Sequence, residues 1–246
     1  MKICADLHTH TIASDHAFST VSEICAAAHT AGLRAVAITD HAPAMEDAPH
    51  RWHFTTMHML PRVCQDVFIL RGAELNIVDY EGAVDLTPDA LRKLDFVIAS
   101  FHDTVLRPGR EEDHTRALLT VADNPLIDCL GHPGQPQFAF DHETVIRRCR
   151  ETGTLLEINN NSFLVRSRGI SVCRELARLC ARYEVPVVVN SDAHWAGMAG
   201  QTPRALAMLA EISFPERLIL NLSWPRLCDY FQNRKGLSIE KETTTI

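Results

Sequence analysis

The chain lacks the features that mark membrane, secreted and disulfide-stabilised proteins. No apolar run is long enough to cross a bilayer, and charged and polar residues come too early for a signal peptide in the opening stretch Met1-Lys2-Ile3-Cys4-Ala5-Asp6. The eight cysteines are scattered, and no two of them form a Cys-x-x-Cys pair. This pattern is typical of reduced, structural thiols. We therefore expect a cytoplasmic protein with no membrane-bound part.

The sequence also lacks the signals for nucleotide cofactors, serine hydrolases and nucleic acids. It contains no Gly-x-Gly-x-x-Gly, no Gly-x-x-x-x-Gly-Lys and no Gly-x-Ser-x-Gly. Basic residues do not dominate, because 24 Lys and Arg stand against 31 Asp and Glu, for a formal net charge of −7. Proteins that bind nucleic acid broadly depend on an excess of Lys and Arg. Nucleic acid is therefore not an expected partner.

Apolar strands and helices alternate along a chain of ordinary globular composition, 46% hydrophobic and 22% charged. Strands are expected at 2–7, 34–39, 67–70, 95–100, 127–130, 154–158, 186–190 and 218–221. Helices are expected at 20–31, 56–65, 88–93, 111–122, 141–151, 171–183, 203–212 and 225–234. The alternation predicts an α/β fold with a parallel sheet covered by helices. No boundary divides it, so we expect one domain over 1–246, with a polar tail from about residue 238.

Potential metal ligands follow these strands one or two at a time. There are nine: His8, His10, His16, His41, Glu74, His102, His132, Asp192 and His194. An open doubly wound sheet would gather its site at one switch point, whereas ligands after almost every strand fit the carboxyl end of a closed barrel. Side chains at i and i+2 of a strand point the same way, so His8 and His10 can face one point. Nine ligands exceed the needs of one four-coordinate ion, so we expect two or three ions.

Each of these residues also has an ordinary interpretation. A lone histidine at a strand end is usually a surface residue or a satisfied core residue, but independent accidents at six strand ends are improbable. Histidines inside or near the starts of helices are expected in solvent, namely His29, His114 and His142. Within the insertion at 42–52 and just after it, His50 and His53 would form either a substrate-binding rim or a packed loop.

The order of these motifs resembles that of the PHP (polymerase and histidinol phosphatase) superfamily. The motifs are Asp6-Leu7-His8-Thr9-His10, His16, Thr39-Asp40-His41, Gly72-Ala73-Glu74, Phe101-His102, Gly131-His132-Pro133 and Ser191-Asp192-Ala193-His194. The fuller match is to its YcdX-like phosphatases. It includes the insertion Met45-Glu46-Asp47-Ala48-Pro49-His50, the stretch Leu156-Glu157-Ile158-Asn159-Asn160-Asn161-Ser162-Phe163, and Ile219-Leu220-Asn221. The stretch after His102 matches less well.

The resemblance implies a single-domain, distorted (β/α)7 barrel of the TIM-like kind, with three divalent ions at the carboxyl ends of its strands. These ions are usually zinc, with manganese or iron as alternatives. By carry-over, one ion would be held by His8, His10, Glu74 and Asp192. Glu74 would bridge to a second ion, shared with His102 and His132, and a third would be held by His16, His41 and His194. Relatives also suggest a small homo-oligomer.

These expectations lead to a metal-dependent phosphatase that hydrolyses phosphate monoesters of small molecules. Arg166 and Arg168 are candidates for clamping the substrate phosphate, since arginine favours bidentate contact with oxyanions, although surface charge explains them as well. Asp6, Asp15 and Asp40 are candidates for orienting ligand imidazoles. The alternatives are a phosphodiesterase or exonuclease of the same superfamily, a histidinol phosphatase, and a non-catalytic metal-binding protein.

Overall fold

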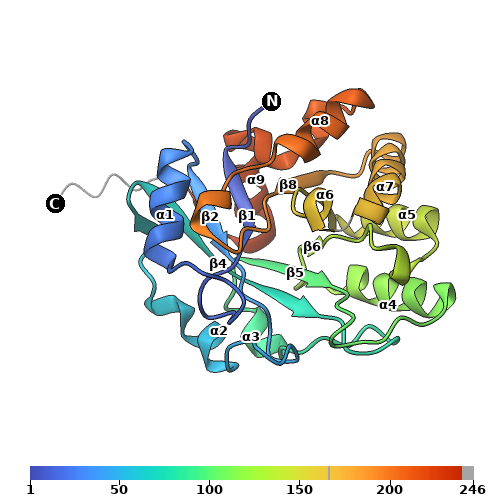
Figure 1. Ribbon diagram of the computed structural model, residues 1–246, viewed down its shortest axis with the longest axis horizontal. Coiled ribbons are helices and arrows are strands. Elements are labelled where there is room, and N and C mark those ends of the chain that lie inside the picture. Colours follow the sequence, from blue (N-terminus) through green and yellow to red (C-terminus); the bar gives the residue numbers. More distant parts are fainter. Residues whose placement is uncertain (166, 240–246) are drawn as a thin grey trace.

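The computed structural model describes residues 1–165 and 167–239 as a parallel barrel surrounded by helices (Figure 1). Its strands are β1 (Ala5–Thr9), β2 (Ala35–Ile38), β3 (Val63–Cys64), β4 (Val67–Asn76), β5 (Phe96–Ser100), β6 (Cys129–Leu130), β7 (Leu155–Asn159) and β8 (Val187–Asn190). Neighbouring strands pair in the order β1-β2-β4-β5-β6-β7-β8, all parallel, and β3 adds to β4 antiparallel. The predicted seven-stranded, TIM-like barrel is confirmed.

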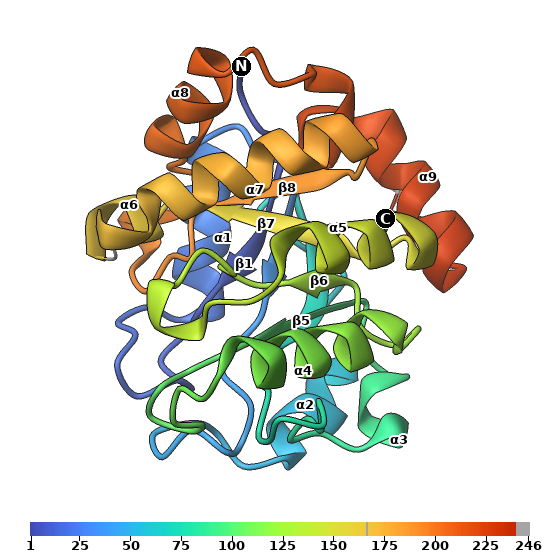
Figure 2. The ribbon, with the colours of Figure 1, turned by 90° about the vertical axis from the view of Figure 1, so that its right-hand side faces the viewer.

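The helices pack against the outside of the barrel. They are α1 (Val21–Thr30), α2 (Trp52–Thr56), α3 (Pro88–Leu91), α4 (Glu111–Asp123), α5 (His142–Thr152), α6 (Ser162–Val165), α7 (Ile170–Tyr183), α8 (Pro203–Glu211) and α9 (Trp224–Lys235). Figure 2 shows α4, α5 and α7 side by side over β5 to β8. Local sequence sets the helix ends: Thr20 and Glu23 form a capping box at the start of α1, and Gly153 ends α5 with a φ of 75°. No helix in the described residues has the length and apolarity needed to cross a membrane.

Alternate residues of each strand face two different hydrophobic clusters. One set fills the barrel together with side chains of α9. The combined cluster includes Leu7, Phe68, Phe96 and Ile98 from strands and Phe231 from α9. The other set, including Ile38, Ile69 and Val97, packs against the surrounding helices. Because both faces are buried, the strands read as continuous apolar runs. The strand residues that face the barrel interior are apolar along most of each strand and polar near its carboxyl end.

Asparagine side chains complete the seam where β1 meets β8. Asn221 accepts the N–H of Val189 at 3.0 Å and donates to the carbonyls of Ala5 at 2.8 Å and of Val189 at 2.7 Å. Asn190 accepts the N–H of Leu7 at 3.0 Å. The barrel is therefore distorted at this seam, because side-chain amides replace part of the strand-to-strand ladder.

Two sequence-based predictions of secondary structure were wrong, both because of local backbone constraints. The helix expected at 56–65 is replaced by α2, a 3₁₀ turn over Met57–Met59 and the strand β3. Pro61 holds Leu60 extended (ψ 138°), and Gln65 and Asp66 both have positive φ, which makes the turn of a hairpin into β4. The strand expected at 218–221 consists of 3₁₀ turns, with Ile219 alone pairing to Val187.

The expectations for the helix histidines and for the C-terminal tail have different outcomes. His114 is buried rather than solvated, since its Nδ1 lies 2.7 Å from the carbonyl of Ala139 and its Nε2 accepts the N–H of Gly109 at 2.8 Å. It thereby joins the loops that follow β5 and β6, whereas His29 is exposed as expected. Ile239 packs into the inner cluster, and the predicted polar tail beyond it lies outside the described residues.

Candidate metal centre

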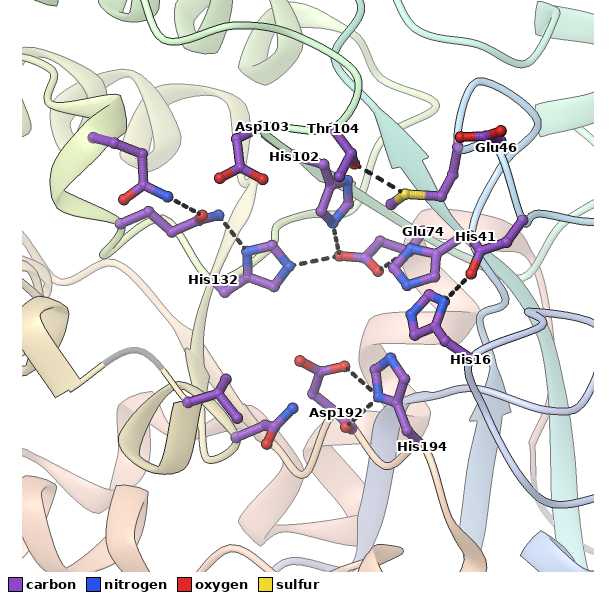
Figure 3. A pocket seen from close by; sticks show the side chains of 16 residues that line it. His16, His41, Glu46, Glu74, His102, Asp103, Thr104, His132, Asp192 and His194 are labelled. Atoms are coloured by element: carbon purple, nitrogen blue, oxygen red, sulfur yellow. Dashed lines mark hydrogen bonds and ion pairs between the residues drawn. The ribbon is translucent and has the colours of Figure 1, made fainter.

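The polar residues at the carboxyl ends of the strands converge on one cavity (Figure 3). In most strands this follows from the two-residue period: Phe96, Ile98, Ser100 and His102 continue one inward row on and beyond β5. The strand β1 differs, because a register shift between Asp6 and Thr9 breaks its alternation. Ala5 and Leu7 face the inner cluster, and the irregularity lets His8 and His10 face the centre as well.

Two proposed ligands have an unusual backbone. His132 has a φ of 27° and Asp192 a φ of 55°, in the left-handed region that side-chain-bearing residues rarely adopt. Each follows a strand end, where the turn aims its side chain at the cavity. Such conformations cost on the order of 1–3 kcal/mol and are concentrated at functional sites.

Four potential ligand atoms lie at distances typical of a metal site. His8 Nε2 lies 3.1 Å from His10 Nε2, 3.2 Å from Glu74 Oε2 and 3.6 Å from Asp192 Oδ1. His10 Nε2 lies 3.5 Å from Glu74 Oε2 and 3.2 Å from Asp192 Oδ1. Zinc bonds of roughly 2.0–2.1 Å at tetrahedral angles would place neighbouring ligand atoms about 3.3–3.4 Å apart. All five distances fall close to that value, so Glu74 Oε2 and Asp192 Oδ1 each lie at ligand spacing from both histidine nitrogens.

The two oxygens of Glu74 face different groups of histidines. Oε2 faces His8 and His10, and it also lies 2.9 Å from His41 Nδ1. Oε1 lies 2.8 Å from His132 Nε2 and 3.4 Å from His102 Nε2. The hydroxyl of Ser100 also donates to Oε1 at 2.7 Å, which fixes the carboxylate. This is the arrangement that a bridging carboxylate requires.

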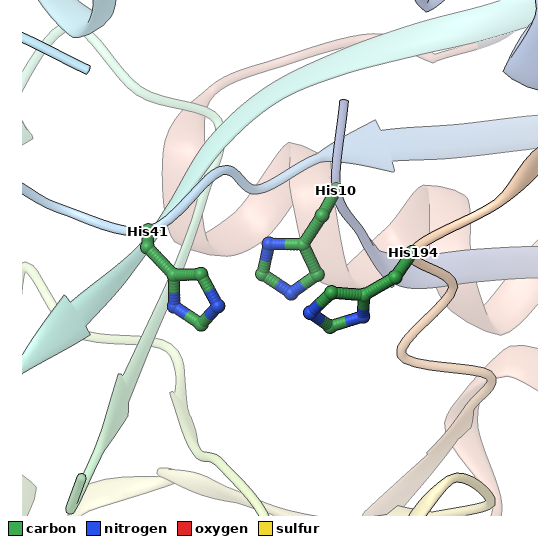
Figure 4. Close-up of side chains that lie close together, drawn as sticks. All are labelled: His10, His41 and His194. Carbon is green, nitrogen blue, oxygen red and sulfur yellow. The ribbon is translucent and has the colours of Figure 1, made fainter. Parts of the chain in front are cut away.

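A third group consists of imidazoles only. Potential ligand atoms of His10, His41 and His194 lie within 4.8 Å of one another (Figure 4). The family resemblance predicts His16, rather than His10, as the third member of this group. The His16 ring centroid lies 4.9 Å from those of both His41 and His194, but its side chain is 42% exposed. The structure thus brings all nine predicted residues together, with His16 at the outer edge.

The donor set fits divalent ions, and orphaned polar atoms are the clearest sign of it. Glu74 Oε2, His102 Nε2, His10 Nδ1 and His41 Nδ1 are buried atoms that make no well-aligned hydrogen bond among the described residues, although Glu74 Oε2 and His41 Nδ1 lie 2.9 Å apart. Leaving such atoms unpaired costs about 1–3 kcal/mol each, which a bound ion would offset for the atoms that it contacts. The opposite nitrogen of His102 is held by Asn76 Oδ1 at 2.7 Å. A ligand histidine characteristically donates its other ring N–H in this way.

The charge balance of the site also favours cations. Burial lowers the pKa of His10 to about 3 and that of His102 to about 4, so both imidazoles are neutral and can offer a lone pair. Burial alone would raise the pKa values of Glu74 and Asp192. The surrounding histidines outweigh it and hold both well below their usual range. The buried carboxylates therefore remain ionised, and they outweigh burial at His8 and His41 and raise the pKa of both imidazoles, so positive charge is favoured at this place.

Several supporting residues were missed or misassigned from the sequence. Asp47 Oδ2 lies 2.5 Å from His16 Nδ1 and can accept its proton. Gln135 Nε2 donates to His132 Nδ1 at 2.9 Å, which leaves the proton of a neutral His132 ring on Nε2, facing Glu74. Glu157 lies 2.7 Å from His8 Nδ1, and its signal was a charged residue inside an apolar strand. Asp47 and Gln135 lie in loops, whose conformation the sequence pattern does not reveal.

The three aspartates named from the sequence do not orient the proposed ligands. Asp6 accepts from the backbone of Ser191 and Gly200 and from the Ser191 hydroxyl, and so anchors the loop after β8. Asp40 accepts from Thr11 and Ser14 and contacts His53. Asp15 is exposed, and its backbone N–H donates to Asp47. Asp6 and Asp40 hold loops in place instead.

The cavity has a volume of about 710 Å³ and is lined mainly by polar residues. Besides the proposed ligands, its wall includes Glu46, Asp103, Thr104, Gln135 and Asn161. Three of the residues predicted to bind substrate are described by the structure. His53 Nε2 lies 3.2 Å from Asp40 Oδ2, and the His50 ring packs edge-to-face against Trp52. Arg168 is exposed. None of these three lines the cavity, and Arg166 lies outside the described residues.

Comparison with known proteins identifies the family of this chain. The PHP domain model matches residues 6–161. A probable phosphatase of Acetivibrio thermocellus is 43% identical and covers 96% of this chain and 98% of that protein. One from Clostridium botulinum strain Langeland is 39% identical over the same shares. A crystal structure of histidinol phosphate phosphatase from Lactococcus lactis, complexed with zinc, L-histidinol and phosphate, shares the fold. It has a TM-score of 0.57 at 16% identity and covers 89% of this chain and 96% of its own.

The match to the family model spans more than half of the chain, and the likeness to the probable phosphatases extends over nearly all of it. The matched residues 6–161 contain seven of the nine clustered residues, and Asp192 and His194 lie beyond them. We conclude that the chain belongs to the PHP domain family, as a relative of the proteins called probable phosphatases.

Proposed function

We propose that this protein is a metal-dependent phosphatase that hydrolyses phosphate monoesters of small molecules. The observation that carries the proposal is that Glu74 Oε2 and Asp192 Oδ1 lie 3.2–3.6 Å from both His8 Nε2 and His10 Nε2, next to a second oxygen of Glu74 that faces other histidines. Such a set holds adjacent ions that share one carboxylate. The names of the relatives, probable phosphatases, point to the same reaction.

The proposed residues would hold three ions. His8, His10, Glu74 and Asp192 would hold one. Glu74, His102 and His132 would hold a second, and His16, His41 and His194 a third, with His10 close enough to join it. The mixed imidazole and carboxylate set favours zinc, with manganese or iron as alternatives. Bound ions would supply hydroxide at neutral pH and offset the charge of the phosphate during hydrolysis.

The protein's own groups would bind and orient the substrate. Thr104, Gln135 and Asn161 line the cavity and can hydrogen-bond the part of the substrate beyond the phosphate. The exposed carboxylates of Glu46 and Asp103 lie on the same wall and would repel a polyanionic strand. We therefore favour a small monoester over a nucleic acid. Arg166 and Arg168 remain candidates for phosphate binding on sequence grounds, although Arg168 does not line the cavity.

The test is hydrolysis of p-nitrophenyl phosphate by protein loaded with zinc or manganese, compared with chelator-treated protein. We expect release of p-nitrophenol that chelation abolishes and added metal restores. Metal analysis should give three ions per chain, and a count near one would contradict the trinuclear arrangement. The alternatives give different results. Faster hydrolysis of bis(p-nitrophenyl) phosphate would favour a phosphodiesterase, preference for histidinol phosphate a histidinol phosphatase, and metal binding without turnover a non-catalytic protein.

A cytoplasmic location and a small homo-oligomer complete the proposal. Both rest on the sequence and on the family resemblance. Light scattering coupled to gel filtration would measure the oligomeric state, and a single-chain mass would contradict that part of the proposal.

A further inference from the structure

Glu157 lies on β7 beneath the proposed metal centre, fully enclosed by protein. Nitrogen atoms surround both of its oxygens. Oε1 lies 2.7 Å from His8 Nδ1 and 2.9 Å from Asn190 Nδ2. Oε2 lies 2.8 Å from the backbone nitrogen of His132 and 3.1 Å from Asn159 Nδ2. Four partners from three strands and one loop thus meet at a single buried carboxylate.

The surroundings determine which of these partners donate. Asn190 Oδ1 accepts the backbone N–H of Leu7 at 3.0 Å, so its amide nitrogen faces Glu157. Asn159 Oδ1 likewise accepts the N–H of Ser162 at 2.9 Å. Together with the backbone N–H of His132, three of the four partners can only donate. An ionised carboxylate is an acceptor only, and it satisfies them all.

This arrangement also determines the tautomer of His8. Because Glu157 offers acceptors alone, the Nδ1 of His8 must carry the proton. In the neutral ring that a metal ion requires, Nε2 then presents a lone pair to the position shared with His10, Glu74 and Asp192. The network extends further, since the amide nitrogen of Asn159 also donates to Asp192 Oδ2 at 3.1 Å.

We propose that Glu157 is the positioning residue of the metal centre, fixing the His8 tautomer and coupling His8, His132 and Asp192 so that its loss affects two ion positions at once. The inference rests on the proposed metal-dependent function. It assigns Glu157 no contact with substrate or with the reacting atoms. Glu157 acts through the ligands that it holds.

The proposal predicts that Glu157→Gln is not a conservative change. In one orientation the amide nitrogen of the new glutamine would face two groups that can only donate, the His132 N–H and Asn159 Nδ2. In the other orientation it would face the Asn190 donor and donate toward His8 Nδ1, which would then have to lose its proton. Loss of a partner that orients a metal ligand typically lowers metal affinity about 10- to 100-fold. We expect a loss of this size for the first two ions, with a smaller effect on the third.

The matched control is Asp128→Asn at the opposite end of the barrel. Asp128 is also a fully buried carboxylate, and it accepts from Val97 N–H at 2.9 Å and Lys235 Nζ at 2.8 Å. It makes no contact with a proposed ligand. Both variants lose a buried charge and should be less stable, but Asp128→Asn should retain metal affinity within about twofold, well below the range expected for ligand support.

The experiment measures zinc affinity by chelator competition and metal content by elemental analysis for the wild type and both variants. Wild-type affinity in Glu157→Gln would overturn the proposal, as would an equal loss in Asp128→Asn. If the wild type binds no metal, the proposed function fails instead. Should Glu157→Gln not fold, long-range ¹H–¹⁵N NMR of histidines in the zinc-loaded wild type decides, with His8→Gln giving the assignment. A proton on Nδ1 of His8 supports the proposal, and a proton on Nε2 overturns it.

Discussion

Removing the side chain of Asn221 should open the seam between β1 and β8. In Asn221→Ala, three buried backbone groups lose their partners: the N–H of Val189, the carbonyl of Val189 and the carbonyl of Ala5. Asn221 itself is fully buried, so solvent cannot replace it without entering the barrel wall. The seam lies directly below the loops that carry His10 and Asp192.

The size of the effect follows from the count of orphaned groups. An unsatisfied buried polar group costs about 1–3 kcal/mol, so three of them would cost about 3–9 kcal/mol if nothing relaxed. Entry of a water molecule would recover part of this, and we expect a net loss of about 3–6 kcal/mol. Domains are typically stable by only about 5–15 kcal/mol, so the loss should be conspicuous.

The assay is equilibrium urea unfolding followed by circular dichroism, on metal-free protein so that ion binding does not contribute. Asn233→Ala, at an exposed position of α9, is the control and should change stability by no more than about 0.5 kcal/mol. Asn221→Asp keeps the shape but turns an acceptor toward two carbonyls, so it should be at least as destabilising as alanine. A loss below about 1 kcal/mol in Asn221→Ala would refute the reasoning.

Four further predictions concern the metal centre. Glu74→Ala should remove two of the three proposed ions, because its oxygens face different histidines, and a loss of one ion by elemental analysis would argue against bridging. Asp47→Asn should weaken the third ion alone, about 10- to 100-fold in a metal titration, while Asp15→Asn nearby should not. Arg168→Ala should change KM less than about twofold, because Arg168 does not line the cavity. A tenfold rise in KM would instead indicate that Arg168 binds the substrate phosphate. Chelation should lower Tm by about 5–10 °C for each ion removed, given about 2.7 kcal/mol of stabilisation per site at a hundredfold excess of metal over Kd, and an unchanged Tm would contradict structural coupling of the ions.

The barrel was predictable from the sequence because its strands are buried on both faces. The two-residue period then carries the inward row of β5 from Phe96 through Ile98 and Ser100 to His102, so a ligand at that end is a direct consequence of the strand. The strand β1 shows where this argument stops. Its inward residues are Ala5 and Leu7, and only a register shift admits His8 and His10 to the centre. A shift of that kind leaves no mark in the residue pattern.

The residues that contact and orient the proposed ligands were harder to predict from the sequence than the proposed ligands themselves. Glu157 is a charged residue in an apolar strand, which is costly unless it is paired, and this signal could have indicated a buried network without naming its members. Asp47 reaches His16 from a loop whose path depends on tertiary contacts. Asp6 and Asp40 precede or adjoin ligands in sequence, yet their carboxylates face loop backbones and hydroxyls rather than those ligands.

The proposed ligands come from both ends of the chain, and this limits when a complete site can form during synthesis and folding. His8 and His10 are made first, but their partner Asp192 follows almost all the strands. No early fragment can therefore offer the complete set of four proposed ligands, and an ion can be captured there only once the barrel has closed. Metal uptake in this protein should thus report completed folding, and chains that stop short of closure would remain inactive without a separate checkpoint.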